Sequence, residues 1–249
     1  MTHNDALGDD IPYDEVEVED DEKAKFAVRL IDVSRAYSIG TREIEALRNV
    51  NLEVRPGEFI AVSGPSGSGK TTLLNVIGAI DYVTSGRVFV MDVPIGDYDE
   101  TFRATFRLTN TGFIFQSYNL VSTLTALENV MFPMQLADHP IDVLEQEGMD
   151  LLKMVELEER ADHLPWQLSS GEQQRVAIAR AMANDPPIIL ADEPTANLDS
   201  MSAEMVRELL REVHSKGKAV ITMTHDQELM KTRGARHLTM ENGVLSKNV

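Results

Sequence analysis

Four short apolar runs constrain the fold of this chain more than any other feature. They lie at residues 59–62, 113–115, 188–191 and 219–223, and they lack the polar alternation of a half-exposed strand. Such runs are typical of parallel strands that are covered on both faces. Helical patterns lie between them, at residues 71–80, 172–183 and 203–213. Alternating strands and helices predict a doubly wound α/β sheet.

The rest of the chain predicts two additions to this sheet. Residues 28–33 and 44–54 look like strands of an antiparallel flank, and Arg55-Pro56-Gly57 has the composition of a turn. Residues 122–164 contain no buried-strand run. Leu144, Leu151, Leu152 and Val155 of this stretch fall on one helical face. We therefore expect one domain, residues 26–249, with a helical subdomain inserted at about residues 117–170.

Negative charge is concentrated at the N-terminus. The net charge of the 249 residues is −18, and residues 1–25 carry −8 of it. A segment this acidic and this poor in large apolar groups does not offset the entropy of ordering it. We predict a disordered, solubilising tail at residues 1–25, with docking on a basic partner as the alternative. The net charge of −10 on residues 26–249 argues against nucleic acid as a partner.

The sequence contains no segment of the length and apolarity that a membrane span requires, about 20 residues. Its first residues also lack the basic start and apolar centre of a secretory signal. Both observations predict that the protein stays in the cytoplasm. Cysteine is absent, which excludes disulfides and thiolate metal sites.

A glycine-rich segment follows the first apolar run and matches G-x-x-x-x-G-K-[ST]. Its residues are Gly64, Pro65, Ser66, Gly67, Ser68, Gly69, Lys70, Thr71 and Thr72. Glycines at these positions let backbone N–H groups wrap phosphates at a helix N-terminus. Lys70 would reach the β- and γ-phosphates, and the Thr71 hydroxyl would ligate Mg²⁺. A chance Gly/Ser turn is the alternative, but the strand before and the helix after favour a nucleotide site.

Two acids, Asp192 and Glu193, follow the third apolar run. A carboxylate at the end of a buried strand can hold Mg²⁺, and a second one beside it can polarise the water that attacks a γ-phosphate. Asp192 is the metal candidate and Glu193 the candidate base. Alone, such a pair is more often a helix N-cap and a solvated side chain, but the phosphate loop on a neighbouring strand favours the catalytic interpretation.

Gln116 follows the second run and His225 the fourth. In an open α/β sheet, ligands bind beyond the carboxyl ends of the strands. Gln116 could orient water or contact Mg²⁺. His225 could hydrogen-bond the γ-phosphate and help to arrange Glu193. A loop hydrogen-bonder and a structural histidine remain the alternatives.

Residues 168–175, Leu-Ser-Ser-Gly-Glu-Gln-Gln-Arg, resemble the signature motif of the ABC ATPases, and the resemblance extends over nearly the whole chain from about residue 27. It implies a phosphate-loop NTPase fold with a mostly parallel core sheet, an antiparallel β flank and a helical subdomain. It also implies roles for individual residues. These are the Walker B pair Asp192 and Glu193, the Q-loop Gln116, the switch His225, the D-loop Asn197-Leu198-Asp199, and Tyr37 as the aromatic that stacks on adenine.

The signature residues Ser169, Ser170, Gly171 and Glu172 start a predicted helix. Its unpaired N–H groups and dipole favour an anion. In the family this anion is the γ-phosphate of ATP held by another subunit, which implies a head-to-tail dimer with two composite sites. We expect a homodimer, with a pair of this chain and a close relative as the alternative. Ser170 stands where the family usually has glycine. If that position needs φ > 0 or a close backbone approach, serine costs about 1 kcal/mol.

Residues 115–130 and 190–199 resemble a narrower branch, which contains lipoprotein-release, macrolide-efflux and cell-division ATPases. This resemblance implies an ATP- and Mg²⁺-dependent ATPase at the cytoplasmic face of the cell membrane that powers a separate transmembrane permease-type subunit. A regulatory module that switches an extracytoplasmic enzyme or sensor without transport is the alternative. A soluble ABC protein acting on nucleic acid is disfavoured by the acidic body.

Overall fold

The computed structural model describes residues 25–40 and 42–247. The predicted acidic tail lies outside the described residues, apart from Lys25. Within the described part, the strands form a six-stranded sheet in the order β10-β9-β3-β8-β7-β6 and a four-stranded sheet in the order β2-β1-β4-β5. None of the described helices has the length and apolarity needed to span a membrane.

The six-stranded core sheet contains all four predicted buried strands. They are β3 (Phe59–Ser63), β6 (Thr111–Ile114), β7 (Ile188–Asp192) and β8 (Ala219–Met223), and neighbouring members of this set pair in parallel. Strand β9 (Arg236–Glu241) pairs parallel to β3, and β10 (Val244–Lys247) pairs antiparallel to β9. These last two strands were not predicted, because only alternate residues of β9 are buried and its sequence is therefore no continuous apolar run.

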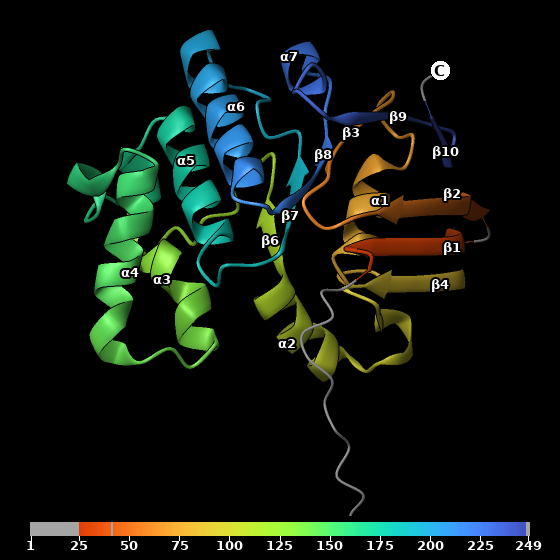
Figure 1. Ribbon diagram of the computed structural model, residues 1–249, viewed down its shortest axis with the longest axis horizontal. Coiled ribbons are helices and arrows are strands. Elements are labelled where there is room, and N and C mark those ends of the chain that lie inside the picture. The colour runs from red at the N-terminus through yellow and green to blue at the C-terminus, as the bar shows by residue number, and fades with distance from the viewer. Residues whose placement is uncertain (1–24, 41, 248–249) are drawn as a thin grey trace, which may run out of the picture.

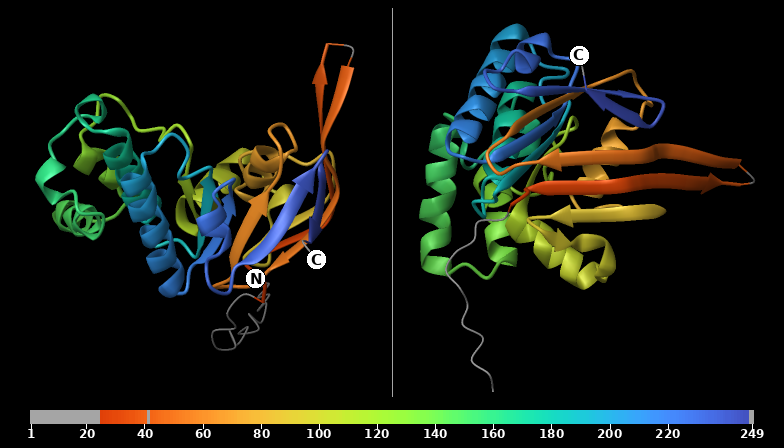
Figure 2. Two further views of the ribbon diagram at one scale, coloured as in Figure 1. Left: turned by 90° about the horizontal axis from the view of Figure 1, so that it is seen from above. Right: turned by 45° about the vertical axis from the view of Figure 1, so that its right-hand side comes forward.

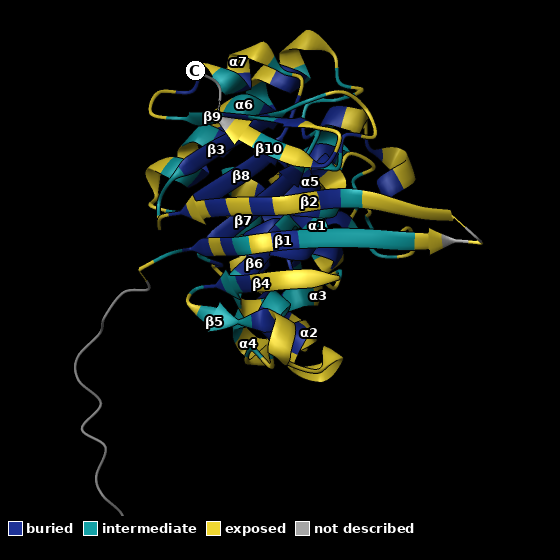
Figure 3. Ribbon diagram, turned by 90° about the vertical axis from the view of Figure 1, so that its right-hand side faces the viewer, coloured by how far each residue is buried: buried dark blue, intermediate teal, exposed yellow. Residues whose placement is uncertain are grey.

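The four-stranded flank is antiparallel, as predicted. It consists of β1 (Val28–Ile39), β2 (Arg42–Val54), β4 (Ser85–Val90) and the short β5 (Val93–Pro94). Strands β1 and β2 are longer than the sequence indicated, and their outer ends project beyond the body as a hairpin (Figure 2). The outer end of β2 is exposed while its inner end alternates between buried and exposed residues (Figure 3).

Helices cover both faces of the core sheet (Figure 1). Helix α1 (Lys70–Ile77) lies on the side of the flank, and α5 (Ser170–Ala181) and α6 (Ser200–Ser215) lie on the opposite side. Helix α1 ends three residues before the predicted Ile80 because Gly78 caps it and Ala79 adopts φ 55°. The structure also contains η1 (Ile95–Asp97), α2 (Glu100–Asn110) and α7 (Gln227–Met230), which the sequence analysis did not identify.

The segment between β6 and α5 is helical. It contains α3 (Ala126–Leu136), α4 (Ile141–Met154), η2 (Glu158–Arg160) and η3 (Pro165–Gln167). Leu144, Leu152 and Val155 are buried, as the helical face predicted, and Leu151 is partly buried. Helices α3 and α4 approach closely because Gly148 has no side chain: a Cβ there would lie 2.8 Å from Leu127 and Met131. The subdomain boundaries at 117 and 170 stay a prediction.

The two faces of β3 show why its sequence is continuously apolar. Ile60 and Val62 pack into the cluster that the core sheet forms with α1 and the flank. Phe59 and Ala61 pack into the cluster formed with α3, α4, α5 and α6. Because neither face meets water, the strand has no polar alternation, and its chemistry is confined to the residues that follow its carboxyl end.

Candidate functional site

A cleft of about 590 Å³ opens beyond the carboxyl ends of the core strands. Its walls contain predicted residues from four separate segments: Ser66, Gly67, Gly69, Lys70, Thr71, Thr72, Gln116, Asp192, Glu193 and His225. Parallel strands bring their carboxyl ends to one edge, so residues far apart in sequence meet there. Gly64, Pro65 and Ser68 belong to the same loop without lining the cleft.

At two positions of the glycine loop (residues 64–72), the backbone leaves no room for a side chain. Gly64 and Gly69 have φ of 150° and 109°. A Cβ on Gly64 would lie 2.0 Å from the Met240 carbonyl oxygen, and one on Gly69 would lie 2.4 Å from the Ala46 carbonyl oxygen. Gly69 is also the N-cap of α1 and offers no side-chain cap. The first N–H groups of α1 are therefore available to an anion.

Lys70 places a positive charge inside the loop. Its side chain is 8% exposed, and Nζ donates to the carbonyl oxygens of Gly64, at 2.6 Å, and Pro65, at 3.2 Å. Nζ also lies 3.4 Å from His225 Nε2 and 3.9 Å from Glu193 Oε1. The ammonium group thus lies between the phosphate loop and the predicted base.

Thr71 and Asp192 meet as the sequence predicted. Thr71 Oγ1 donates to Asp192 Oδ2 across 2.8 Å, which links the start of α1 to the end of β7. Mg²⁺ prefers oxygen ligands and is usually held by one or two carboxylates together with substrate phosphates. A hydroxyl and a carboxylate beside the glycine loop fit that requirement. Gln116 lines the same cleft from the end of β6.

Glu193 has a backbone conformation that non-glycine residues rarely adopt, with φ 46°. Its N–H donates to the Met223 carbonyl oxygen on β8 at 2.8 Å, and its own carbonyl accepts from Ala196 at 3.0 Å. The backbone N–H of His225 donates to Glu193 Oε2 at 3.2 Å, and His225 Nε2 lies 3.4 Å from Oε1. Strained backbone of this kind is concentrated at functional sites. His225 thus lies beside Glu193, and the part its imidazole plays in arranging that carboxylate stays a prediction.

The signature segment (residues 168–175) lies outside the cleft wall. Ser169 caps α5 by a reciprocal capping box: its Oγ accepts from the Glu172 N–H at 3.2 Å, and Glu172 Oε2 accepts from the Ser169 N–H at 2.8 Å. Ser169 and Ser170 are exposed. Partial burial alone would raise the pKa of Glu172, but hydrogen bonds from Ser169 and the nearby Arg160 outweigh it, so this pKa is lowered.

Ser170 does not carry the backbone cost that the sequence analysis considered for it. It is the first residue of α5, is exposed, and has no positive φ. The glycine requirement falls on Gly171 instead. A Cβ there would lie 2.3 Å from Ser202 Oγ and 2.7 Å from Ser202 Cβ on α6.

The same side chain introduced at these two neighbouring positions is expected to have different effects. Gly171→Val forces α5 away from α6, and overpacking of this kind costs about 1–3 kcal/mol. In Ser170→Val the new side chain points into solvent, so this variant serves as the matched control. Urea unfolding of both variants measures the difference. An equal loss of unfolding free energy in the two would contradict the close α5–α6 contact.

Tyr37 does not line the cleft. It lies near the end of β1, beyond the part of that strand that pairs with β4, is half-buried, and its hydroxyl donates to Asp81 Oδ2 at 2.5 Å. The cleft contains four residues that the sequence analysis missed, Ala46, Thr195, Ala196 and Asp226. Asp226 directly follows the predicted site residue His225, so its place in the sequence could have indicated that it lines the cleft. Ala46 comes from β2 of the flank, and nothing local in the sequence relates it to the glycine loop.

Comparisons with known proteins agree with this geometry. Residues 47–196 match the family model described as ABC transporter. An uncharacterised ABC transporter ATP-binding protein of Thermotoga maritima is 46% identical, over 83% of this chain and 88% of that protein. The lipoprotein-releasing system ATP-binding protein LolD of Paramagnetospirillum magneticum is 42% identical, over 88% of this chain and 96% of LolD.

A longer relative and a solved structure extend the comparison. The macrolide export ATP-binding/permease protein MacB of Brucella melitensis is 44% identical over 87% of this chain, which spans only 33% of MacB. The dimeric post-hydrolysis structure of the cassette MJ0796 bound to ADP and Pi superimposes with a TM-score of 0.82 at 42% identity. The superposition covers 88% of this chain and 98% of the MJ0796 chain.

These matches confirm the predicted fold class, ATP as the ligand, ATP hydrolysis, and the branch. By its cleft, its signature helix and its relatives, the chain belongs to the ABC transporter family, as an ATP-binding and ATP-hydrolysing subunit in the branch that includes LolD and MacB.

Proposed function

We propose that two copies of this chain bind head to tail and hold ATP between the glycine loop of one copy and the signature segment of the other. The observation that carries this proposal is the separation of two anion sites in one chain. The glycine loop lines the cleft, whereas Ser169 and Ser170 are exposed at the start of α5 and outside it. The dimeric form of MJ0796 supports the same arrangement.

Each cleft residue then has a chemical role. The N–H groups at the start of α1 and the Lys70 ammonium bind the β- and γ-phosphates. Thr71 and Asp192, with Gln116 beside them, hold Mg²⁺, which neutralises phosphate charge when bound. Glu193 accepts a proton from the attacking water. His225 and the carbonyl of Met223 keep the Glu193 carboxylate and backbone in place.

The signature segment completes the site from the other copy. Ser169, Ser170 and Gly171 present the N-terminus of α5, where N–H groups and the helix dipole favour the γ-phosphate. Closure of the dimer is therefore stabilised by ATP and released by hydrolysis, because ADP lacks the group that joins the two halves. The exposure of Ser170 means that its hydroxyl is no obstacle to this contact.

The work of this cycle is done on a separate transmembrane permease-type subunit at the cytoplasmic face of the membrane. A groove of about 440 Å³ between α2, β6 and α3 suits that partner. Its lining is mainly apolar and includes Ile80, Phe115 and Leu136. Phe115 directly precedes Gln116, so a partner in this groove lies next to the nucleotide cleft.

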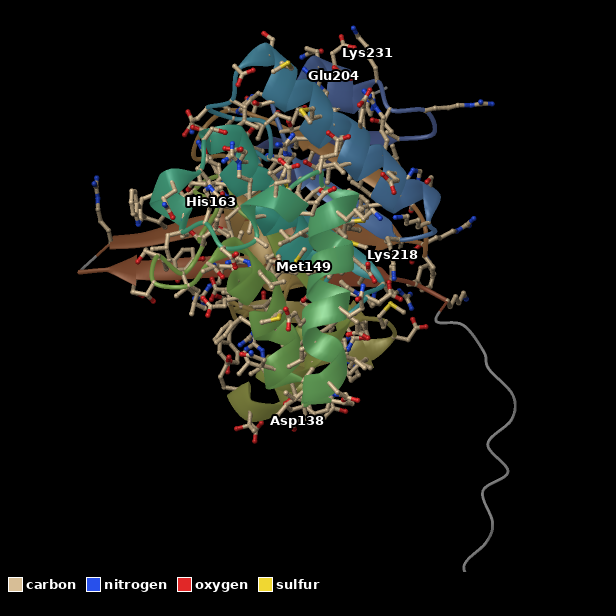
Figure 4. The ribbon with its side chains drawn as sticks, turned by 90° about the vertical axis from the view of Figure 1, so that its left-hand side faces the viewer. Asp138, Met149, His163, Glu204, Lys218 and Lys231 are labelled. Carbon is tan, nitrogen blue, oxygen red and sulfur yellow. The ribbon has the colours of Figure 1, made fainter. Side chains whose placement is uncertain are left out.

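A charged residue in this groove is expected to separate binding of the partner from ATP turnover. Leu136 is 58% exposed, so Leu136→Glu alters the groove without opening the core. Ile141→Glu, at 88% exposure on α4 outside the groove, is the control. Figure 4 shows the face that carries α4, with Met149 on that helix and Asp138 at the α3–α4 turn.

The measurement is affinity purification from solubilised membranes, with identification of the membrane protein that co-purifies. Leu136→Glu should lose that protein and keep its basal ATPase activity, whereas Ile141→Glu should keep both. Retention of the same membrane protein by Leu136→Glu, at the yield of the unaltered chain, would contradict the groove as the dock.

A further inference from the structure

The Tyr37 ring is held by an ion-paired network around Asp81. Tyr37 donates its hydroxyl proton to Asp81 Oδ2 across 2.5 Å. Arg35 Nε donates to the same oxygen at 3.1 Å, and Arg35 Nη2 lies 2.7 Å from Oδ1. The Arg35 guanidinium also lies over the Tyr37 ring, 4.4 Å from its centre. One carboxylate therefore fixes both the end of the ring and the cation that covers one of its faces.

Asp81 is in turn fixed to the C-terminal end of α1. Its backbone N–H donates to the Asn75 carbonyl oxygen at 3.1 Å. Arg103 of α2, only 2% exposed, donates from Nη2 to the carbonyl oxygens of Ala79, at 2.8 Å, and Asp81, at 2.7 Å. Two of these bonds come from a cation at the negative end of the helix dipole, which strengthens them.

Helix α1 connects this network to the phosphate site. It begins at Lys70 and ends at Ile77, four residues before Asp81. A hydrogen-bonded helix of this length behaves as a short rigid rod. The position of the Tyr37 ring is therefore set relative to the glycine loop by Asp81 and α1, although Tyr37 itself is on β1 of the flank.

We propose that Asp81 is a positioning residue for the purine base of ATP: it holds the Tyr37 ring in the orientation in which the base stacks on it. This inference rests on the adenine-stacking role that the family resemblance implies for Tyr37, and on the proposed function, in which the glycine loop holds the phosphates. Arg35 covers one face of the ring, so the base stacks on the opposite face. A ring fixed in advance does not have to be ordered when ATP binds, and that ordering weakens affinity by about 2- to 12-fold.

Two substitutions remove the tether in different ways. Asp81→Ala removes the carboxylate, and Tyr37→Phe removes only the hydroxyl and keeps an aromatic ring. Both should raise KM for ATP by about 2- to 12-fold, with kcat within about twofold of the unaltered chain. The double variant should be no worse than Asp81→Ala, because both changes break one network.

Inorganic tripolyphosphate, which has no base, separates base positioning from a general structural effect. Its inhibition constant should be unchanged in both variants. Glu58→Ala is the matched control: Glu58 pairs with Arg236 at 2.9 Å and is 24% exposed, against 17% for Asp81, but its carboxylate bonds to Arg55 and Arg236 and not to Tyr37. It should leave KM for ATP unchanged.

Two results would overturn the proposal: an unchanged KM for ATP in folded Tyr37→Phe, or a parallel loss of tripolyphosphate affinity, which would place the effect at the phosphate loop. If Asp81→Ala does not fold, Tyr37→Phe still decides. Failure of the proposed function looks different, because the unaltered chain would then stay monomeric at saturating Mg-ATP.

Discussion

Glu193→Gln is expected to retain ATP binding and to lose turnover by about 100- to 10,000-fold, the range that a general base contributes. Glutamine has nearly the shape of glutamate but does not accept the proton of the attacking water. The backbone bonds that hold this residue at φ 46°, to Met223 and Ala196, do not involve its side chain and should survive. Phosphate release and nucleotide binding, measured on the same preparation, separate the two effects.

A carboxylate outside the cleft provides the control for this experiment. Glu204→Gln removes a charge from α6, where Glu204 pairs with Arg207 and Arg211. Turnover should stay close to that of the unaltered chain. If Glu193→Gln also turns over ATP at the unaltered rate, Glu193 is not the base.

Lys70→Ala is expected to weaken ATP binding by about 30- to 5,000-fold, since truncating one partner of a buried charged contact costs about 2–5 kcal/mol. Lys70 is 8% exposed and is the cation that the glycine loop encloses. Its loss leaves both the triphosphate and the Gly64 carbonyl without this donor. Isothermal titration with ATP measures the change.

Lys218 offers a lysine of similar burial for comparison. It is 13% exposed, pairs with Asp185 at 2.6 Å, and lies outside the cleft, on the face shown in Figure 4. Lys218→Ala should bind ATP as the unaltered chain does. An affinity of Lys70→Ala within about threefold of that value, or less than 1 kcal/mol, would remove Lys70 from the phosphate site.

The sequence predicted the parts of the fold and site that depend on local chemistry. Strands β3, β6, β7 and β8 were visible because both of their faces are buried, which leaves an uninterrupted apolar run. The meeting of Lys70, Thr71, Asp192, Glu193, Gln116 and His225 followed from one rule, that parallel strands share a carboxyl edge. Neither inference needed knowledge of contacts between distant segments.

What remained hidden depends on tertiary packing. Helix α2 has a polar sequence and buries Arg103 and Phe106, and an arginine in a core is not visible as a core residue. Tyr37 and Asp81 are 44 positions apart, so nothing local relates them. The glycine requirement at residue 171 rather than 170 follows from the proximity of Ser202 on another helix.

The separation of the cleft from the signature segment is also a property of the folded chain. Both were recognised as anion sites, but a sequence does not say whether one chain brings them together. In the structure Ser169 and Ser170 do not line the cleft that contains Lys70. The proposed function therefore requires two copies to complete one site, and this is its central claim.

Cross-linking between two single-cysteine variants tests that claim most directly, because the chain has no cysteine of its own. Ser66 and Ser170 are both exposed, and each is replaced by cysteine in a separate Glu193→Gln preparation. Mixed in equal amounts and treated with a short bifunctional thiol reagent, they should form a covalent pair with Mg-ATP, and much less of it with ADP or without nucleotide. Chains that stay monomeric at saturating Mg-ATP, with the same cross-linking yield in all three conditions, would contradict the account.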